Sequence, residues 1–174
     1  ECEPSGAEKI DIEIGEGGTT ARFLLSLLSC GKRTYRLKLA GRLAERPWSE
    51  LTEVLQQGGA TITRTENIIE VRGPVSLSNL PRRISGQRST QFASALQLAF
   101  HEDGMRFEMS NATSSLRYWD LTLHCLETID RTETLLVPGD WSSAAFPLAF
   151  AAVTGQFVEL PELSHDAVQA DAFL

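Results

Sequence analysis

Three absences narrow the class of this 174-residue sequence. It has no excess of basic residues: its net charge is −7, which argues against a general nucleic-acid-binding protein. It lacks any apolar run close to the roughly 20 residues that a membrane-spanning helix needs. Residues 1–11 are acidic and polar, so they are not a signal peptide. We therefore expect neither a nucleic-acid nor a membrane partner.

Cysteine is sparse as well. Cys2, Cys30 and Cys125 form neither a Cys-x-x-Cys pair nor a Cys/His ligand spacing, so the sequence predicts no metal site. A low, odd number of cysteines argues for a reducing compartment, and thus a cytoplasmic protein, rather than for a disulfide-stabilised fold. With 42% apolar residues, the chain can bury the core of a domain of ordinary size.

What the sequence does contain is an internal repeat. Three segments, 19–28, 89–98 and 142–151, open with a pair of small hydroxyl residues and continue as an apolar helix. Each helix ends near a glycine, and each glycine is followed by the alternating pattern of a strand. The glycines are Gly31, Gly104 and Gly155, and the predicted strands are residues 34–39, 105–109 and 156–160.

The first repeat unit is predicted to be β-α-β-α-β-β. Pro47 marks the start of its second helix, and Gly58 and Gly59 mark the end. The predicted elements are a strand at 10–14, a helix from 18 or 19, a strand at 35–39, a helix at 48–57, and a hairpin of 60–64 with 68–71.

The second unit begins in the same way but is short. A strand at 80–84, a helix at 89–100, a strand at 105–109 and a helix at 115–127 are predicted. The helix starts Thr20 and Thr90 are 70 positions apart, whereas Thr90 and Ser143 are 53 apart, and the shortfall of 17 is about one hairpin. We predict that this hairpin is lacking near 131–133. The third unit stops in a predicted helix at 173–174, so we expect the chain to be a fragment.

The helix starts of the repeat are suited to anion binding. A helix N-terminus offers unpaired backbone N–H groups and a partial positive charge, and glycines let an oxyanion approach the backbone closely. Segments 15–20 and 85–91 combine glycine with Ser or Thr, and arginines lie near both. Ser and Thr also cap helices in any protein, so plain capping stays an alternative.

Five segments resemble, in order and spacing, motifs of the EPSP synthase family. They are the glycine loop 15–22, the Arg46-Pro47 pair, the Ser89-Thr90-Gln91-Phe92 turn, the helix start 115–120 and the segment 139–144. The resemblance implies an α/β (α+β) fold of repeated β-α-β-α-β-β units, arranged as an inside-out α/β barrel. Residues 1–138 would then be two units of the N-terminal substrate-binding domain, and 139–174 the truncated start of a unit of the second domain.

The resemblance also implies a reaction, in which the enolpyruvyl group of phosphoenolpyruvate passes to the 5-hydroxyl of shikimate 3-phosphate and phosphate is released. This is a step of the shikimate pathway toward aromatic amino acids. It implies two small anionic substrates, no cofactor, no metal, and a cytoplasmic monomer. The family's N-terminal Lys-Ser-x-Ser-Asn-Arg segment and its C-terminal half with the catalytic groups are absent. We therefore identify no catalytic residue and expect the fragment to be inactive.

Residue roles follow from the resemblance alone. Arg22 is expected to support the glycine loop or to act electrostatically at long range, and Asp140 lies at the domain crossover or caps a helix. Glu16 replaces the usual Asn and puts a negative charge near the anion pocket. Shikimate 3-phosphate would be bound by Ser89, Thr90, Gln91, Ser115 and Tyr118, and phosphoenolpyruvate by Gly18, Arg46 and Gln91.

Two alternatives stay open. A UDP-N-acetylglucosamine enolpyruvyltransferase shares the repeat and the chemistry, but that family usually carries a Cys in the loop that corresponds to residues 40–47, where this sequence has none. The other alternative is a phosphate-binding module without activity, which the missing hairpin and Glu16 would suit.

Overall fold

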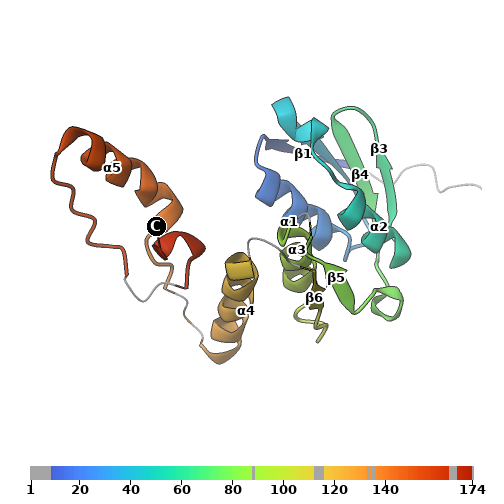
Figure 1. The fold of residues 1–174 in the computed structure, drawn as a ribbon. Helices are drawn as coiled ribbons and strands as arrows, with labels where there is room; N and C mark the ends of the chain where they lie inside the picture. The colour runs from blue at the N-terminus through green and yellow to red at the C-terminus, as the bar shows by residue number, and fades with distance from the viewer. Residues whose placement is uncertain are drawn as a thin grey trace, which may run out of the picture. The chain divides into compact units, whose positions relative to one another are not determined.

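The computed structural model describes residues 9–87, 89–111, 116–132, 134, 136–164 and 168–173. The chain divides into two compact units, Glu1–Ser114 and Ser115–Leu174, and each is described by itself (Figure 1). Among the described residues, no helix is both long and apolar enough to cross a membrane.

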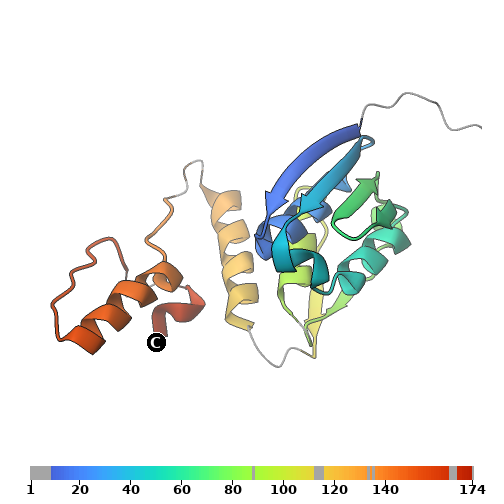
Figure 2. The same ribbon diagram turned by 90° about the horizontal axis from the view of Figure 1, so that it is seen from above.

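A four-stranded mixed sheet, in the order β1-β2-β4-β3, forms the first unit together with its helices. β1 (Lys9–Gly15) runs parallel to β2 (Thr34–Leu39), and Figure 2 shows the two strands side by side. β4 (Ile68–Arg72) is antiparallel to both β2 and β3 (Thr61–Arg64). The parallel pair needs a crossover connection, which a helix supplies. This strand order confirms the predicted mixed α/β class.

The helices of the first unit begin and end near the predicted residues. α1 (Gly18–Leu28) crosses from β1 to β2, and α2 (Ser49–Gln57) ends at Gly58. Between β2 and α2 lies the short 3-10 helix η1 (Gly41–Glu45). The β-α-β-α-β-β order of the first repeat is therefore confirmed.

Alternation along the strands separates a buried face of the sheet from a charged one. Leu37, Ile69 and Val71 are fully buried on the inner face. On the outer face, Nζ of Lys9 lies 2.9 Å from Oε2 of Glu70, and this ion pair is one of several between oppositely charged side chains of neighbouring strands. The others join Asp11 to Arg36 and to Lys38, and Glu13 to Lys38.

The second repeat has shorter strands than predicted. β5 (Arg83–Ser85) pairs in parallel with β6 (Glu108–Ser110), where strands at 80–84 and 105–109 were expected. The reason lies in α3 (Gln91–Ala99), which packs against α1. The buried Gln97 amide donates to the Met105 carbonyl and accepts from the Phe107 N–H, both at 2.9 Å. These two backbone groups are therefore held by a helix rather than by a neighbouring strand.

The second compact unit contains α4 (Leu116–Arg131), α5 (Trp141–Thr154) and the 3-10 turn η3 (Ala170–Phe173). The predicted strand at 156–160 is wrong, because these described residues follow Gly155 as irregular backbone without a partner strand. The helix expected at the last residues is a 3-10 turn as far as the structure describes it. The domain boundary at 138/139 and the missing hairpin near 131–133 stay predictions.

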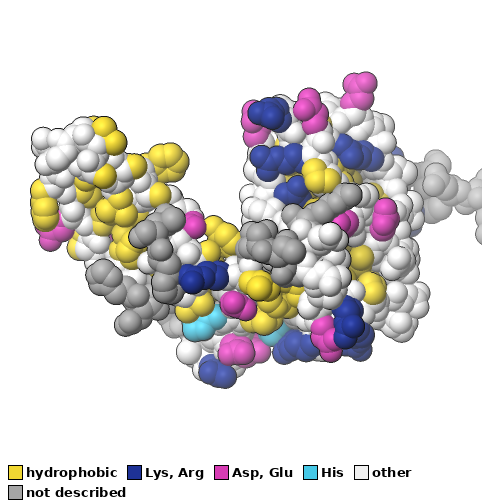
Figure 3. Space-filling model, in the orientation of Figure 1, with side chains coloured by type: hydrophobic (Ala, Val, Ile, Leu, Met, Phe, Trp, Pro, Cys, Tyr) yellow, Lys and Arg dark blue, Asp and Glu magenta, His cyan; other side chains and the backbone are white. Residues whose placement is uncertain are grey.

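α5 is an unusual helix for a surface position, because it contains no charged residue. Only Ala144 is buried, whereas Phe146 is 80% and Val153 87% exposed. Figure 3 shows hydrophobic side chains gathered over this helix. A helix that is apolar on all sides normally belongs to a core, but the residues that the structure describes leave most of the large apolar side chains of α5 exposed.

Candidate anion-binding site

The site is built around Gly18, the first residue of α1. A Cβ atom at Gly18 would lie 2.8 Å from Nη1 of Arg46 and 3.2 Å from Nη1 of Arg22. Glycine leaves room here for two guanidinium groups to approach its backbone, which lies at a helix N-terminus. Three residues that the sequence predicted, Gly18, Arg22 and Arg46, are brought together.

Arg22 is buried one turn into α1, with 5% of its surface exposed. Its Nη1 donates to Oε1 of Gln91 at 2.7 Å, and its Nη2 donates to the Pro47 carbonyl at 3.4 Å. Its guanidinium carbon lies 5.4 Å from the ring centroid of Trp48 and 5.2 Å from that of Phe92, within cation–π distance of both. Arg22 therefore links the start of α1 to the starts of α2 and α3.

The site carries positive charge that the described residues do not neutralise. Burial lowers the pKa of Arg22, and the neighbouring positive charge of Arg46 lowers it further. Within the described part of the chain, neither guanidinium forms an ion pair with a carboxylate. Two like charges held close together favour binding of an anion between or beside them.

Gln91, the first residue of α3, connects the start of α3 to the start of α1. Its Nε2 donates to Oγ1 of Thr19 at 3.1 Å, while its backbone N–H donates to Oγ of Ser89 at 3.2 Å. Ser89 is half-buried, but Thr90 is only 1% exposed. Ser89 and Gln91 therefore have side chains partly open to solvent, whereas Thr90 is enclosed in this conformation.

Glu16 belongs to the glycine loop but turns its carboxylate toward η1. A Cβ atom at Gly41, which has a φ of +52°, would lie 2.6 Å from Oε1 of Glu16. The carboxylate thus packs over the Gly41 backbone.

The other predicted residues lie in the second unit. Ser115 is outside the described residues. Tyr118, on α4, donates its hydroxyl proton to Oδ2 of Asp171 at 3.0 Å. Burial raises the pKa of Tyr118, and its hydrogen bond to Asp171 raises it further. Tyr118 therefore stays a protonated donor at neutral pH.

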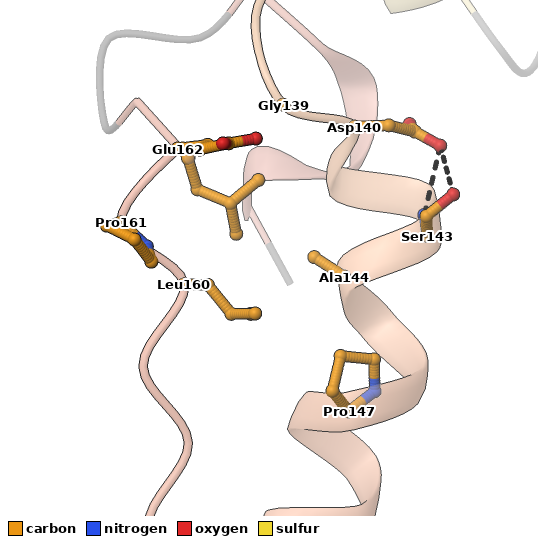
Figure 4. Close-up of a pocket in the computed structure, with 9 residues that line it drawn as sticks. Gly139, Asp140, Ser143, Ala144, Pro147, Leu160, Pro161 and Glu162 are labelled. Carbon is orange, nitrogen blue, oxygen red and sulfur yellow. Dashed lines mark hydrogen bonds between the residues drawn. The ribbon is translucent and has the colours of Figure 1, made fainter.

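Asp140 caps α5, which confirms one of its two predicted roles. Its carboxylate accepts hydrogen bonds from the backbone N–H groups of Ser142 and Ser143, each at 3.1 Å. The hydroxyl of Ser143 also donates to it, and this bond is the main reason that the pKa of Asp140 is lowered. Figure 4 shows the carboxylate directed at the first turn of the helix.

Two pockets in the second unit do not have the chemistry of an anion site. One, of about 390 Å³, lies between α5 and residues 160–163, and Figure 4 shows Leu160 and Ala144 facing its space. The other, of about 430 Å³, is lined mainly by apolar groups beside α4. Neither pocket is lined by an arginine or a lysine, and neither contains a residue of the Gly18 site.

Sequence reasoning missed two participants of the site, Trp48 and Phe92 in its contact with Arg22, whereas Thr19 lies in the segment 15–20 that was predicted to suit anion binding. Phe92 was part of a recognised motif, and Trp48 follows the Arg-Pro pair directly. No periodicity or spacing indicates that either ring would hold an arginine of another helix.

Comparisons with known proteins show which sequences this chain is similar to. A family model described as EPSP synthase (3-phosphoshikimate 1-carboxyvinyltransferase) matches residues 2–132. The 3-phosphoshikimate 1-carboxyvinyltransferase of a Sulfurovum species is 32% identical over 192 residues, which cover 94% of this chain and 44% of that protein. The corresponding protein of Pyrococcus abyssi is 31% identical over 177 residues, covering 92% of this chain and 42% of that protein.

Among solved structures, the EPSP synthase of Acinetobacter baumannii is similar with a TM-score of 0.47 and 22% identity, covering 61% of this chain and 24% of that chain. The chain spans less than half the length of the curated relatives that it matches. The stretch aligned with the Sulfurovum protein is longer than this whole chain, so that relative carries residues within the matched stretch that this chain lacks.

Proposed function

We propose a function on one premise: the chain belongs to the EPSP synthase (3-phosphoshikimate 1-carboxyvinyltransferase) family. The chain supplies the phosphate-binding part of an enzyme that transfers the enolpyruvyl group of phosphoenolpyruvate to shikimate 3-phosphate. In this reaction the 5-hydroxyl oxygen of shikimate 3-phosphate adds to C2 of phosphoenolpyruvate, and phosphate is then eliminated. The single observation that carries the proposal is the approach of Arg22 and Arg46 to the backbone of Gly18.

This arrangement suits a substrate with several negative charges. Arg46 is exposed and lies beside the N-terminus of α1, where its planar fork can bind a phosphate or carboxylate of phosphoenolpyruvate. The backbone of Gly18 offers a close approach that a Cβ atom would block. The two groups together form the phosphoenolpyruvate side of the site.

The turn before α3 forms the other side. Ser89, Thr90 and Ser115 are the residues that the family resemblance assigns to the phosphate of shikimate 3-phosphate. Tyr118 lines the pocket of the shikimate ring, and Gln91 contacts both substrates.

The chemistry proceeds without a cofactor or metal, in a cytoplasmic monomer. The groups that move protons would come from residues that the relatives carry outside the matched stretch, because we find no acid–base pair around Gly18 among the described residues. The names of the relatives reported above favour the shikimate enzyme over a UDP-N-acetylglucosamine enolpyruvyltransferase.

The test has two arms. The protein encoded by the complete reading frame is expected to release phosphate only when both shikimate 3-phosphate and phosphoenolpyruvate are supplied. The chain of 174 residues is expected to bind shikimate 3-phosphate weakly in calorimetry, and Ser89→Ala is expected to weaken this binding. Ser78→Ala, an exposed serine outside the site, is the matched control and should bind as the unchanged chain does.

The arms separate the proposal from its rival, a phosphate-binding module without activity. Binding by the chain without phosphate release by the complete protein would favour the module. Absence of both binding and release would refute the proposed function.

A further inference from the structure

Arg22 is a buried cation that the described residues leave without a carboxylate. Burying an unpaired charge is costly, so a protein retains one only where something holds it and something uses it. Two aromatic rings and two oxygen acceptors hold the guanidinium. Its Nε is buried and has no hydrogen-bond partner among the described residues. The plane of the side chain is thus fixed by stacking as well as by hydrogen bonds.

The contact with Arg22 decides how the amide of Gln91 is oriented. A guanidinium has donors only, so the atom that lies 2.7 Å from Nη1 of Arg22 must be the amide oxygen of Gln91. The NH2 end of the same amide then lies on the other side, where it donates to Oγ1 of Thr19. An amide nitrogen has two N–H groups. The described residues offer no acceptor for the second one, which leaves it available to a ligand.

We propose that Arg22 is a positioning residue, which acts on the bound anion by fixing the amide of Gln91 with its NH2 end toward the N-terminus of α1. The class of ligand is a phosphate or carboxylate anion, whose charged oxygens accept hydrogen bonds. An amide turned the other way would present its oxygen to the anion and repel it. That this anion is a substrate rests on the proposed function, but the orientation of Gln91 does not.

The aromatic rings make the guanidinium specifically necessary. Trp48 follows the Arg46-Pro47 pair, so the start of α2 provides both an exposed cation for the ligand and a ring that holds Arg22. A lysine at position 22 would keep the charge but would lose the planar stacking and the fork that reaches Gln91 and Pro47 together. Arg22→Lys therefore separates positioning from charge.

The first experiment observes the side-chain amide of Gln91 by NMR in the ligand-free chain. We expect its two N–H resonances to be displaced from those of an exposed glutamine and to exchange slowly with water. Arg22→Lys should move them to the exposed values, with cooperative unfolding retained. Arg64→Lys is the matched control, since Arg64 also donates to a backbone carbonyl, that of Ala44, and this change should leave Gln91 unaffected. An unchanged Gln91 signal in Arg22→Lys would overturn the proposal.

The second experiment measures binding of inorganic phosphate and of phosphoenolpyruvate in a double-mutant cycle. We expect Arg22→Lys to weaken binding about tenfold, the loss of one hydrogen bond to a charged group, and to have no further effect in a Gln91→Ala background. Additive losses would mean that Arg22 contacts the anion directly, and would refute positioning.

A third variant covers a failure of Arg22→Lys to fold. Gln91→Glu keeps an acceptor for Arg22 but has no N–H for the anion, so it should remain folded and lose phosphate binding. Phosphate binding equal to that of the unchanged chain would contradict the proposal. If the unchanged chain binds neither anion, the proposed function fails, whereas the NMR result still decides the orientation of Gln91.

Discussion

Gly18→Ala is expected to abolish most anion binding while leaving the fold intact. The added Cβ atom would lie 2.8 Å from Nη1 of Arg46, closer than real contacts allow, and 3.2 Å from Nη1 of Arg22. Arg46 is exposed and flexible, so it can move away at little cost, but it then leaves the position from which it binds the anion. Arg22 is held by its two rings and needs to shift only by a few tenths of an ångström.

The two consequences differ in size. Removing one charge-assisted hydrogen bond costs about 2 kcal/mol, which corresponds to a roughly 30-fold weaker affinity. The free energy of unfolding should change by less than about 1 kcal/mol, because the gain in helix propensity from glycine to alanine offsets the shift of Arg22. Stability and binding should therefore separate in this variant.

The assay is a titration of phosphoenolpyruvate into the chain, followed by NMR, beside thermal unfolding of the same samples. Gly17→Ala is the control, because a Cβ atom there would meet only the side chain of Thr20, at 3.2 Å, and neither arginine. Equal affinity of Gly18→Ala and the unchanged chain, or equal losses in both variants, would refute the reasoning about the two guanidinium groups.

Three further predictions concern the elements that carry the site and the second unit. Asp140→Ala removes the cap of α5 and should cost about 1 kcal/mol of stability, measured by urea denaturation. Because the pKa of Asp140 is lowered in the folded state, this contribution is present above its unfolded pKa of ~4 and is lost as the pH falls through the folded value, so the difference between the two proteins should shrink in acid. Gln97→Leu leaves the Met105 carbonyl and the Phe107 N–H unpaired in the core and should cost roughly 2–4 kcal/mol in the same assay, whereas Gln56→Leu, at an exposed bond, should cost far less. Tyr118→Phe removes the hydroxyl group that donates a hydrogen bond to Asp171. Because this bond is exposed, the free energy of unfolding should change by less than about 1 kcal/mol, measured by thermal unfolding.

The first repeat could be predicted from sequence because its signals are local. Alternation in 10–14 and 35–39 and the glycines at 58 and 59 each act on their own neighbourhood. The late start of β6 could not be predicted, because it depends on Gln97 reaching the backbone at 105 and 107 from a different element. The predicted strand at 156–160 failed for a related reason: an alternating pattern needs a neighbouring strand, which the described residues of its unit do not provide.

The candidate site divides in the same way. Motifs placed Gly18, Arg46 and Gln91 in the site, because each belongs to a short pattern that the family resemblance identifies. The contact between Arg22 and Gln91 joins residues that are 69 positions apart, and stacking on Trp48 depends on how α1 packs against α2. Such contacts follow from the packing of helices, and no local pattern encodes them.

The uncharged character of α5 has a consequence for protease mapping. No lysine or arginine lies within residues 132–174, so trypsin does not cut inside this stretch, whether or not α5 is folded. Chymotrypsin cuts after aromatic residues unless proline follows, so Phe146, which precedes Pro147, is not a site, whereas Phe150 and Phe157 are sites with most of their surface exposed. Resistance of this segment to trypsin therefore says nothing about whether α5 is folded, whereas its rate of cleavage by chymotrypsin does.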